Sequence, residues 1–201
     1  MNKKVLRQFK LKDPIILRVM RTVDWNEWFN LQEDGDYFTS LTRAIVGQQL
    51  SGKAAETIYG RFIGLFDNGV VDPKKLIRIK DQKLRDVGMS WGKVSYVKDL
   101  AEKHLSGEVK LSELNQFTNE EVIGELTKVK GIGPWTGEMF LMFTLRREDV
   151  FSHGDLGLRK GIEKLYNLKS PTVKQIEKII SPWSPYKTYG SIALWHSLDN
   201  R

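Results

Sequence analysis

The chain has 201 residues, 40% of them hydrophobic and 28% charged, which suits one or two domains with an apolar core. Cysteine is absent, which excludes disulfides, thiol catalysis, cysteine-bound zinc and thiolate-held iron–sulfur clusters. No apolar run approaches the roughly 20 residues of a membrane span, so we expect no membrane partner. The net charge of +7, with 6 Trp and 6 Tyr, is compatible with a nucleic-acid partner or simply with a basic surface.

The predicted elements are all helices. Asp13-Pro14 opens the first, which runs through Met20, because Asp is a common N-cap and Pro is tolerated at the first helical position. Capping boxes are predicted at Thr118–Glu121 and Thr172–Gln175. Further helices are expected over about 37–50, 54–66, 94–105, 122–129, 134–145, 176–180 and 185–198, after Asp72-Pro73, and after Asp155. No segment alternates strictly between apolar and polar residues, and Val109–Leu111 is too short to count as a strand. We therefore expect an all-α fold of roughly ten helices.

One short connection, Lys130 to Gly133, joins the helix that ends near Val129 to the helix that begins at Pro134. Gly131 and Gly133 allow positive φ and close backbone approach, and Ile132 between them can brace the turn from inside. The N–H groups of 131–133 and of the next helical turn form a potential anion site, with lysines beside it. A phosphodiester suits this site. The alternative is a tight packing joint between two helices with no ligand.

Asp155 begins a helix after the loop 149–154. Its simplest role is an N-cap. The same placement favours a fixed negative charge that can stabilise a cation or orient a water, so the two roles are compatible. Trp195 and Trp135 are either core residues or π faces of a pocket. The histidines at 104, 153 and 196 have no metal-ligand spacing, and we assign no role to His153, two residues before Asp155.

Several motifs occur in the order found in one enzyme family. They are Ala44 to Ser51 followed by Ala54-Ala55, Gly88 to Ala101, the hairpin Val129 to Thr136, Phe151-x-x-x-Asp155, and Trp183 to Tyr189 leading into Trp195. Together they resemble the helix-hairpin-helix DNA glycosylase superfamily, and within it the DNA-3-methyladenine glycosylase II branch of alkylbase glycosylases. The resemblance covers about 13–198.

The resemblance implies two helical domains with the active site in a cleft between them. Residues 36–147 would form the domain with the helix-hairpin-helix, and 1–35 with 148–201 the domain with Asp155. In this family Asp155 takes the position of the catalytic aspartate, and Trp195 that of an aromatic facing the flipped base. Trp135 falls where bifunctional relatives have a Schiff-base lysine, which implies no lyase activity. Met139 stands where some relatives place a tyrosine in the base pocket.

The remaining roles also follow from the resemblance. Gln49 or Leu50 would fill the gap left in the duplex. The residues expected to contact DNA are Gln49, Leu50, Ser51, Lys130, Gly131, Gly133, Thr136 and Arg159. Main-chain carbonyls of Thr127, Val129 and Ile132 would hold a structural Na⁺ or K⁺, and no other cofactor or iron–sulfur cluster is implied.

The resemblance implies a monofunctional glycosylase of base excision repair that releases alkylated purines such as 3-methyladenine and 7-methylguanine from double-stranded DNA. We expect a monomer, in the nucleoid of a prokaryote or the nucleus of a eukaryote. Three alternatives remain: a glycosylase for deaminated or etheno purines, a non-catalytic DNA-binding module, and an all-α protein-interaction domain, which predicts no salt-dependent affinity for DNA. The carboxylate at 155 argues against a pure binder, because it would repel phosphates.

Overall fold

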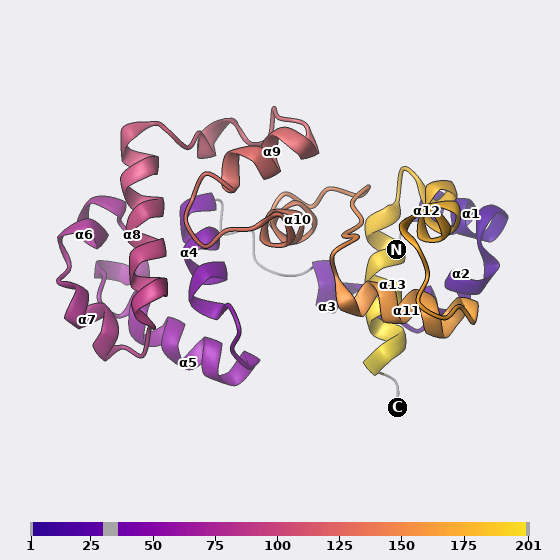
Figure 1. Cartoon of the computed structure of the whole chain (residues 1–201), viewed down its shortest axis with the longest axis horizontal. Helices are drawn as coiled ribbons and strands as arrows, with labels where there is room; N and C mark the ends of the chain where they lie inside the picture. The colour runs from indigo at the N-terminus through magenta and orange to yellow at the C-terminus, as the bar shows by residue number, and fades with distance from the viewer. Residues whose placement is uncertain (1, 30–35, 200–201) are drawn as a thin grey trace. The chain divides into compact units, whose positions relative to one another are not determined.

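The computed structural model describes residues 2–29 and 36–199 (Figure 1). Within those ranges every regular element is a helix, which confirms the predicted all-α fold. The α-helices are α1 (Lys3–Lys12), α2 (Pro14–Met20), α3 (Trp25–Phe29), α4 (Tyr37–Gly47), α5 (Gly52–Ile63), α6 (Pro73–Arg78), α7 (Asp81–Asp86), α8 (Trp91–Ser106), α9 (Asn119–Leu126), α10 (Pro134–Phe143), α11 (Leu156–Tyr166), α12 (Val173–Ile180) and α13 (Lys187–Asp199). Short 3₁₀ turns lie at Asp67–Gly69, Leu111–Glu113 and Ser181–Trp183. No helix of the described part is long and apolar enough to cross a membrane.

The predicted helix starts are mostly correct where a side chain caps the helix. Asp13 accepts hydrogen bonds from the N–H groups of Ile15 and Ile16, and Asp72 caps α6 in the same way. Both capping boxes, at Thr118 and Thr172, are present. The sequence analysis missed α1, although the side chain of Asn2 caps it by accepting the backbone N–H of Lys4 at 3.0 Å. The last helix begins at Lys187 rather than at Pro185 as predicted.

The chain forms two compact units. Unit 1 combines Met1–Gln32 with Leu141–Arg201, and unit 2 is Glu33–Phe140. The change from unit 2 to unit 1 therefore falls inside α10, whereas the domain predicted from the sequence, 36–147, extended past this helix. The cleft expected between the domains stays a prediction.

Unit 1 is built around α13, which packs against α11 and α2. Its core includes the fully buried side chains of Phe9, Met20 and Trp183. A Cβ on Gly161 of α11 would lie 2.9 Å from the Cβ of Leu194 on α13, so these two helices approach as closely as their backbones allow. This close contact fixes α13, which carries Trp195, against the start of α11, which follows Asp155.

Unit 2 is built around the long helix α8, which packs against α4, α6 and α7. Leu41, Ile45, Leu76, Leu84 and Leu100 are fully buried among these helices. The pair α9 and α10 forms the hairpin of this unit. A Cβ on Gly137 of α10 would lie 3.3 Å from the Cγ1 of Ile123 on α9, so the two helices meet closely near the turn.

Candidate functional site

The hairpin turn runs over 127–133, between the end of α9 and the start of α10. Gly131 has φ of +79°, and a Cβ there would lie 2.1 Å from the Cδ2 of Tyr96 on α8. Gly131 is therefore required both by its backbone conformation and by the ring beside it. Gly133 does not adopt positive φ, so the prediction of two such glycines is correct only at Gly131. Ile132 is 5% exposed and braces the turn from inside, as predicted.

Asp99 of α8 holds this turn in place. One carboxylate oxygen accepts the backbone N–H of Lys130 at 2.8 Å. The ammonium groups of Lys130 and Lys103 lie 3.4 and 3.3 Å from the carboxylate oxygens. Burial by itself would raise the pKa of Asp99, but the Lys130 N–H and the two lysine ammonium groups outweigh it and hold the pKa below its ordinary value. The sequence analysis did not select Asp99: Lys103 lies one turn away on the same helix, but Lys130, whose backbone N–H Asp99 accepts, is far along the chain.

Some backbone amides of the turn donate hydrogen bonds within the protein, and others remain available to a ligand. The N–H of Ile132 donates to the carbonyl of Val129 at 3.1 Å, so it is not offered to an anion as predicted. No acceptor within residues 2–29 and 36–199 takes the N–H of Gly131 or Gly133. Those two amides are the ones that remain for a phosphate oxygen. The side chain of Lys130 is 66% exposed beside them, although it also pairs with Asp99.

The loop between α4 and α5 is tied to the same turn. The Gln48 side-chain amide donates to the carbonyl of Gly131 at 2.8 Å. Lys93 of α8 donates to the carbonyl of Val46 at 2.7 Å, which holds the end of α4. Gln49 is exposed with φ of +58°, while Leu50 is half-buried. The sequence singled out Gln49 and missed Gln48, although the Gln-Gln pair was the signal for both.

Three other residues of unit 2 were predicted to contact DNA or a cation: Ser51, Thr136 and Thr127. Ser51 precedes α5 in N-cap conformation without a side-chain cap hydrogen bond. Thr136 is buried, and the Thr127 hydroxyl donates to the carbonyl of Ile123 at 2.8 Å. The cation site predicted at the carbonyls of Thr127, Val129 and Ile132 stays a prediction. No cluster of three or more His, Cys, Asp or Glu that could hold a metal occurs among the described residues.

Asp155 lies in unit 1 and caps α11 from inside the protein, with only 8% of the residue exposed. Its Oδ1 accepts the backbone N–H of Leu158 at 2.8 Å. The same oxygen accepts the indole N–H of Trp195 at 3.0 Å. Two donors therefore fix the orientation of this carboxyl group. The sequence predicted both residues as parts of a site, and the structure places them in direct contact.

Gly157, the second residue of α11, leaves space for this contact. A Cβ on Gly157 would lie 2.9 Å from the Cδ1 of Trp195 and 3.0 Å from the Oδ1 of Asp155. Any larger residue at 157 would push the indole and the carboxylate apart. Gly157 is thus a further candidate that the sequence analysis did not select, because a glycine early in a helix carries no distinctive pattern.

Trp195 belongs to an aromatic cluster with Trp28 and Phe143. The indole rings of Trp195 and Trp28 stack with centroids 6.2 Å apart and planes 12° apart. Phe143 lies 6.0 Å from Trp195 and 5.9 Å from Trp28. Sequence reasoning missed Trp28 and Phe143, since both are single aromatics in apolar stretches. The cluster surrounds Trp195, the residue whose indole N–H contacts the buried Asp155.

The remaining predicted residues are more dispersed. Trp135, 50% exposed, and Met139, half-buried, lie on α10 in unit 2, whereas Asp155 and Trp195 lie in unit 1. In unit 1, the Arg159 guanidinium donates to the carbonyl of Pro171 at 3.4 Å. His153 pairs with Glu177, its Nε2 lying 2.7 Å from Oε1. This pairing joins His153, in the loop that leads to Asp155, to α12.

A family model for DNA repair proteins matches most of the chain. Residues 42–185 match the model of the HhH-GPD superfamily of base excision DNA repair proteins. This match covers more than half of the chain, so the protein belongs to that superfamily, as its motifs predicted.

Curated relatives are similar to this chain over most of its length. The chain is 37% identical over 166 residues to DNA-3-methyladenine glycosylase 1 of Schizosaccharomyces pombe, covering 81% of this chain and 73% of that one. It spans only 60% of some other curated relatives.

Two solved structures share the fold over almost the whole chain. A DNA-3-methyladenine glycosidase of Bacillus halodurans has a TM-score of 0.85 and 34% identity, with 99% of this chain and 91% of that chain covered. The S. pombe 3-methyladenine DNA glycosylase, solved in complex with abasic DNA, has a TM-score of 0.82 and 30% identity, with 98% and 97% covered.

Proposed function

We propose that this protein is a DNA glycosylase that releases alkylated purines such as 3-methyladenine and 7-methylguanine, without lyase activity. The observation that carries the proposal is Asp155, a buried carboxyl group oriented by two donors next to an aromatic cluster. Family membership and the named activities of the relatives support it. The substrate is double-stranded DNA, and we expect the protein to act as a monomer.

The hairpin supplies the contact with the DNA backbone. The N–H groups of Gly131 and Gly133, next to the first turn of α10, suit a phosphate oxygen. Such contacts position the enzyme without reading sequence. A base inside a duplex must be flipped out before its glycosidic bond can be reached, and unstacking costs a few kcal/mol. Gln49 or Leu50, in the loop tied to the hairpin by Gln48, would fill the gap.

The aromatic cluster around Trp195 suits a cationic base. A purine alkylated at N3 or N7 carries a positive charge, and a cation over an aromatic face gains about 0.5–2 kcal/mol. Because such a base leaves as a neutral molecule, protonation of the leaving group is not essential. We assign base contact to Trp195 and, from the family positions, to Trp135 and Met139.

The carboxylate of Asp155 acts on the sugar. When the C1′–N bond breaks, its electron pair leaves with the purine and positive charge develops at C1′ and the ring oxygen. A fixed carboxylate stabilises that charge. It also orients a water, whose oxygen bonds to C1′ and whose proton is released to solvent. The indole N–H of Trp195 positions the carboxylate by holding one of its oxygens.

The absence of lyase activity rests on position 135. A lyase needs an amine nucleophile that forms a Schiff base with C1′. The chain has Trp135 where bifunctional relatives have that lysine. A structural Na⁺ or K⁺ at the carbonyls of the hairpin would support phosphate binding, and the proposed hydrolysis requires no other cofactor. Borohydride trapping on lesion-bearing DNA should give no covalent complex.

The decisive experiment measures bases released from methylated duplex DNA by mass spectrometry under single-turnover conditions. Asp155→Asn should retain duplex binding and lose release of 3-methyladenine and 7-methylguanine. Asp149→Asn is the matched control, since Asp149 is a carboxylate of the same unit that accepts hydrogen bonds from Lys187 and Ser184. Unchanged release by Asp155→Asn would overturn the catalytic assignment.

The same assay separates the alternatives. Release of hypoxanthine or ethenoadenine, but not of methylated purines, would assign the enzyme to deaminated or etheno lesions. Duplex binding with no base released from any substrate would leave a non-catalytic DNA-binding module.

A further inference from the structure

The positive charge of the chain is concentrated near its N-terminus. Residues 3–21 contain seven Lys or Arg and a single acidic residue, Asp13, so this short segment accounts for nearly all of the net charge of +7. Asp13 is buried and caps α2, while also accepting hydrogen bonds from Tyr166 and Trp183. The one acidic group is therefore committed to the core, and the basic groups face outward from α1 and α2.

These cations differ from the paired lysines of unit 2. Among the described residues none of the seven forms an ion pair, whereas Lys75 pairs with Asp67 at 2.9 Å and Lys128 with Glu125 at 2.6 Å. Unpaired like charges held on two adjacent helices repel one another. An anionic partner would relieve that repulsion.

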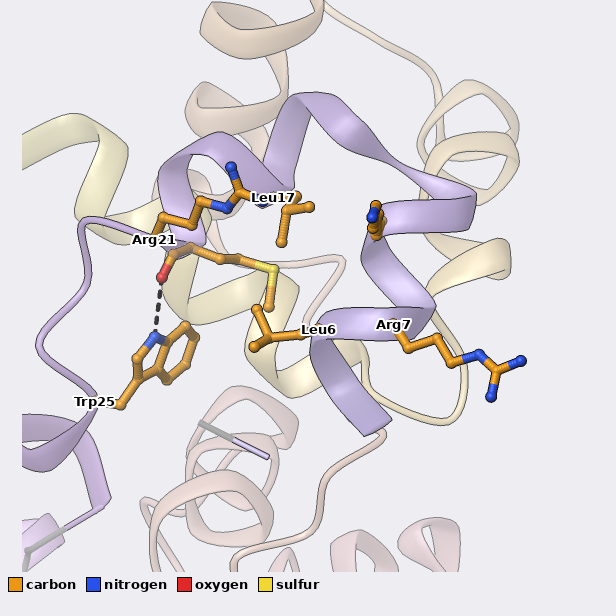
Figure 2. A pocket seen from close by; sticks show the side chains of 7 residues that line it. Leu6, Arg7, Leu17, Arg21 and Trp25 are labelled. Atoms are coloured by element: carbon orange, nitrogen blue, oxygen red, sulfur yellow. Dashed lines mark hydrogen bonds between the residues drawn. The ribbon is translucent and has the colours of Figure 1, made fainter. Parts of the chain in front are cut away.

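The same two helices enclose a pocket of about 440 Å³, shown in Figure 2. Three exposed cations, Arg7, Lys10 and Arg21, line it, and no acidic residue does. Figure 2 shows Leu6 and Leu17 at the same hollow, which Met20 also lines. The site is thus apolar at its base and cationic at its edge.

Trp25 forms one wall and is held firmly. Its indole N–H donates to the carbonyl of Met20 at 2.9 Å, drawn as the dashed line in Figure 2. Its ring also packs against Tyr189, with centroids 5.4 Å apart. A fixed aromatic wall and an adaptable methionine are features of sites that receive an apolar side chain.

We propose that this pocket binds an acidic segment of a partner protein that inserts one apolar side chain. The cationic edge attracts carboxylates, and the apolar base rewards an inserted side chain. Duplex DNA fits the charge but not the hollow, because its backbone presents no apolar group to fill it. A free inorganic anion would pair with the cations but would make no contact with the apolar base of the pocket.

The test uses a display library of random dodecapeptides, selected on the full chain. Bound peptides should be rich in Asp and Glu around one aromatic or large aliphatic residue. A variant with Arg7→Glu, Lys10→Glu and Arg21→Glu should bind a synthetic copy of the enriched peptide at least about tenfold more weakly. Leu6→Ala should also weaken that binding, by about three- to tenfold, through the lost apolar contact.

The matched control changes Lys169, Lys174 and Lys178 to Glu. These lysines are exposed in the same unit and do not line the pocket. The control should bind the peptide and fold as the unaltered chain does. Affinity of the Arg7, Lys10 and Arg21 variant for a short plain duplex should equal that of the control, which has the same net charge. A duplex affinity lower than that of the control would assign this face to DNA and overturn the proposal, as would a selection that enriches no acidic peptides. Base release is independent of this result, so the two proposals fail separately.

Discussion

Replacing Gly131 by alanine should destabilise the hairpin turn, for two separable reasons. The first is the backbone, since φ of +79° costs an L-residue about 1–2 kcal/mol. The second is Tyr96, whose Cδ2 would lie 2.1 Å from the new Cβ. Carbon atoms in contact are normally about 3.5–4.0 Å apart, so the ring or the turn must move by more than an ångström.

The magnitude follows from adding the two effects. Overpacking by one methyl in a well-packed site costs about 1–3 kcal/mol. With the backbone strain, Gly131→Ala should lower the free energy of unfolding by about 2–5 kcal/mol. Gly107 is a matched control, because it has φ of +76° and no atom within 4 Å of its Cβ position. Gly107→Ala should show the backbone strain alone.

Urea unfolding followed by circular dichroism measures both variants. Adding Tyr96→Ala to Gly131→Ala should recover the steric part of the loss in a double-mutant cycle, leaving the strain. Duplex binding by Gly131→Ala should weaken equally for lesion-bearing and plain DNA, since the turn contacts phosphates. The reasoning is wrong if Gly131→Ala is no more destabilising than Gly107→Ala, or if the change at Tyr96 gives no recovery.

Two further predictions concern the carboxylates that the structure singles out. Trp195→Phe keeps an aromatic ring, though a smaller one, and removes the N–H that orients Asp155. Single-turnover base release should therefore fall by about 10- to 100-fold with duplex affinity unchanged. An unaltered rate would show that Trp195 does not position the carboxylate. Asp99→Asn should change the acid sensitivity of the hairpin. Because the pKa of Asp99 is held below its ordinary 3.8 in the folded chain, its ionised form stabilises the fold above that pH, and this stabilisation is lost as pH falls through the lowered value. When the free energy of unfolding is measured against pH, it should therefore fall less steeply below pH 3.8 in Asp99→Asn than in the unaltered chain. The same pH dependence in both proteins would contradict the assignment.

The sequence predicted those parts of the fold that are encoded locally. Asp13, Asp72, Thr118 and Thr172 begin helices because each cap satisfies N–H groups only two or three residues away. Such a signal is complete within a few positions. Helix α1 also has a local cap, Asn2, and it buries Val5 and Phe9 in the core of unit 1, but the sequence analysis did not select it. A helix of ten residues is marginal on its own, so α1 depends on this packing as well as on its cap.

The candidate site shows the same division between local and distant information. Gly131 and Asp155 could be found because a tight turn and a helix start restrict which residues fit there. The groups that orient them, Tyr96, Asp99 and Trp195, come from positions more than thirty residues away in the chain.

Those distant partners have ordinary local roles, a helix-surface tyrosine, a helix-interior aspartate and an apolar tryptophan. Only the close packing of α11 on α13, where Gly161 admits Leu194, places the indole N–H of Trp195 at the Asp155 carboxylate. Orientation of the carboxylate is therefore a property of the packed core of unit 1. It follows that a substitution at Gly161, which touches neither Asp155 nor Trp195, can still disturb base release by shifting one helix against the other.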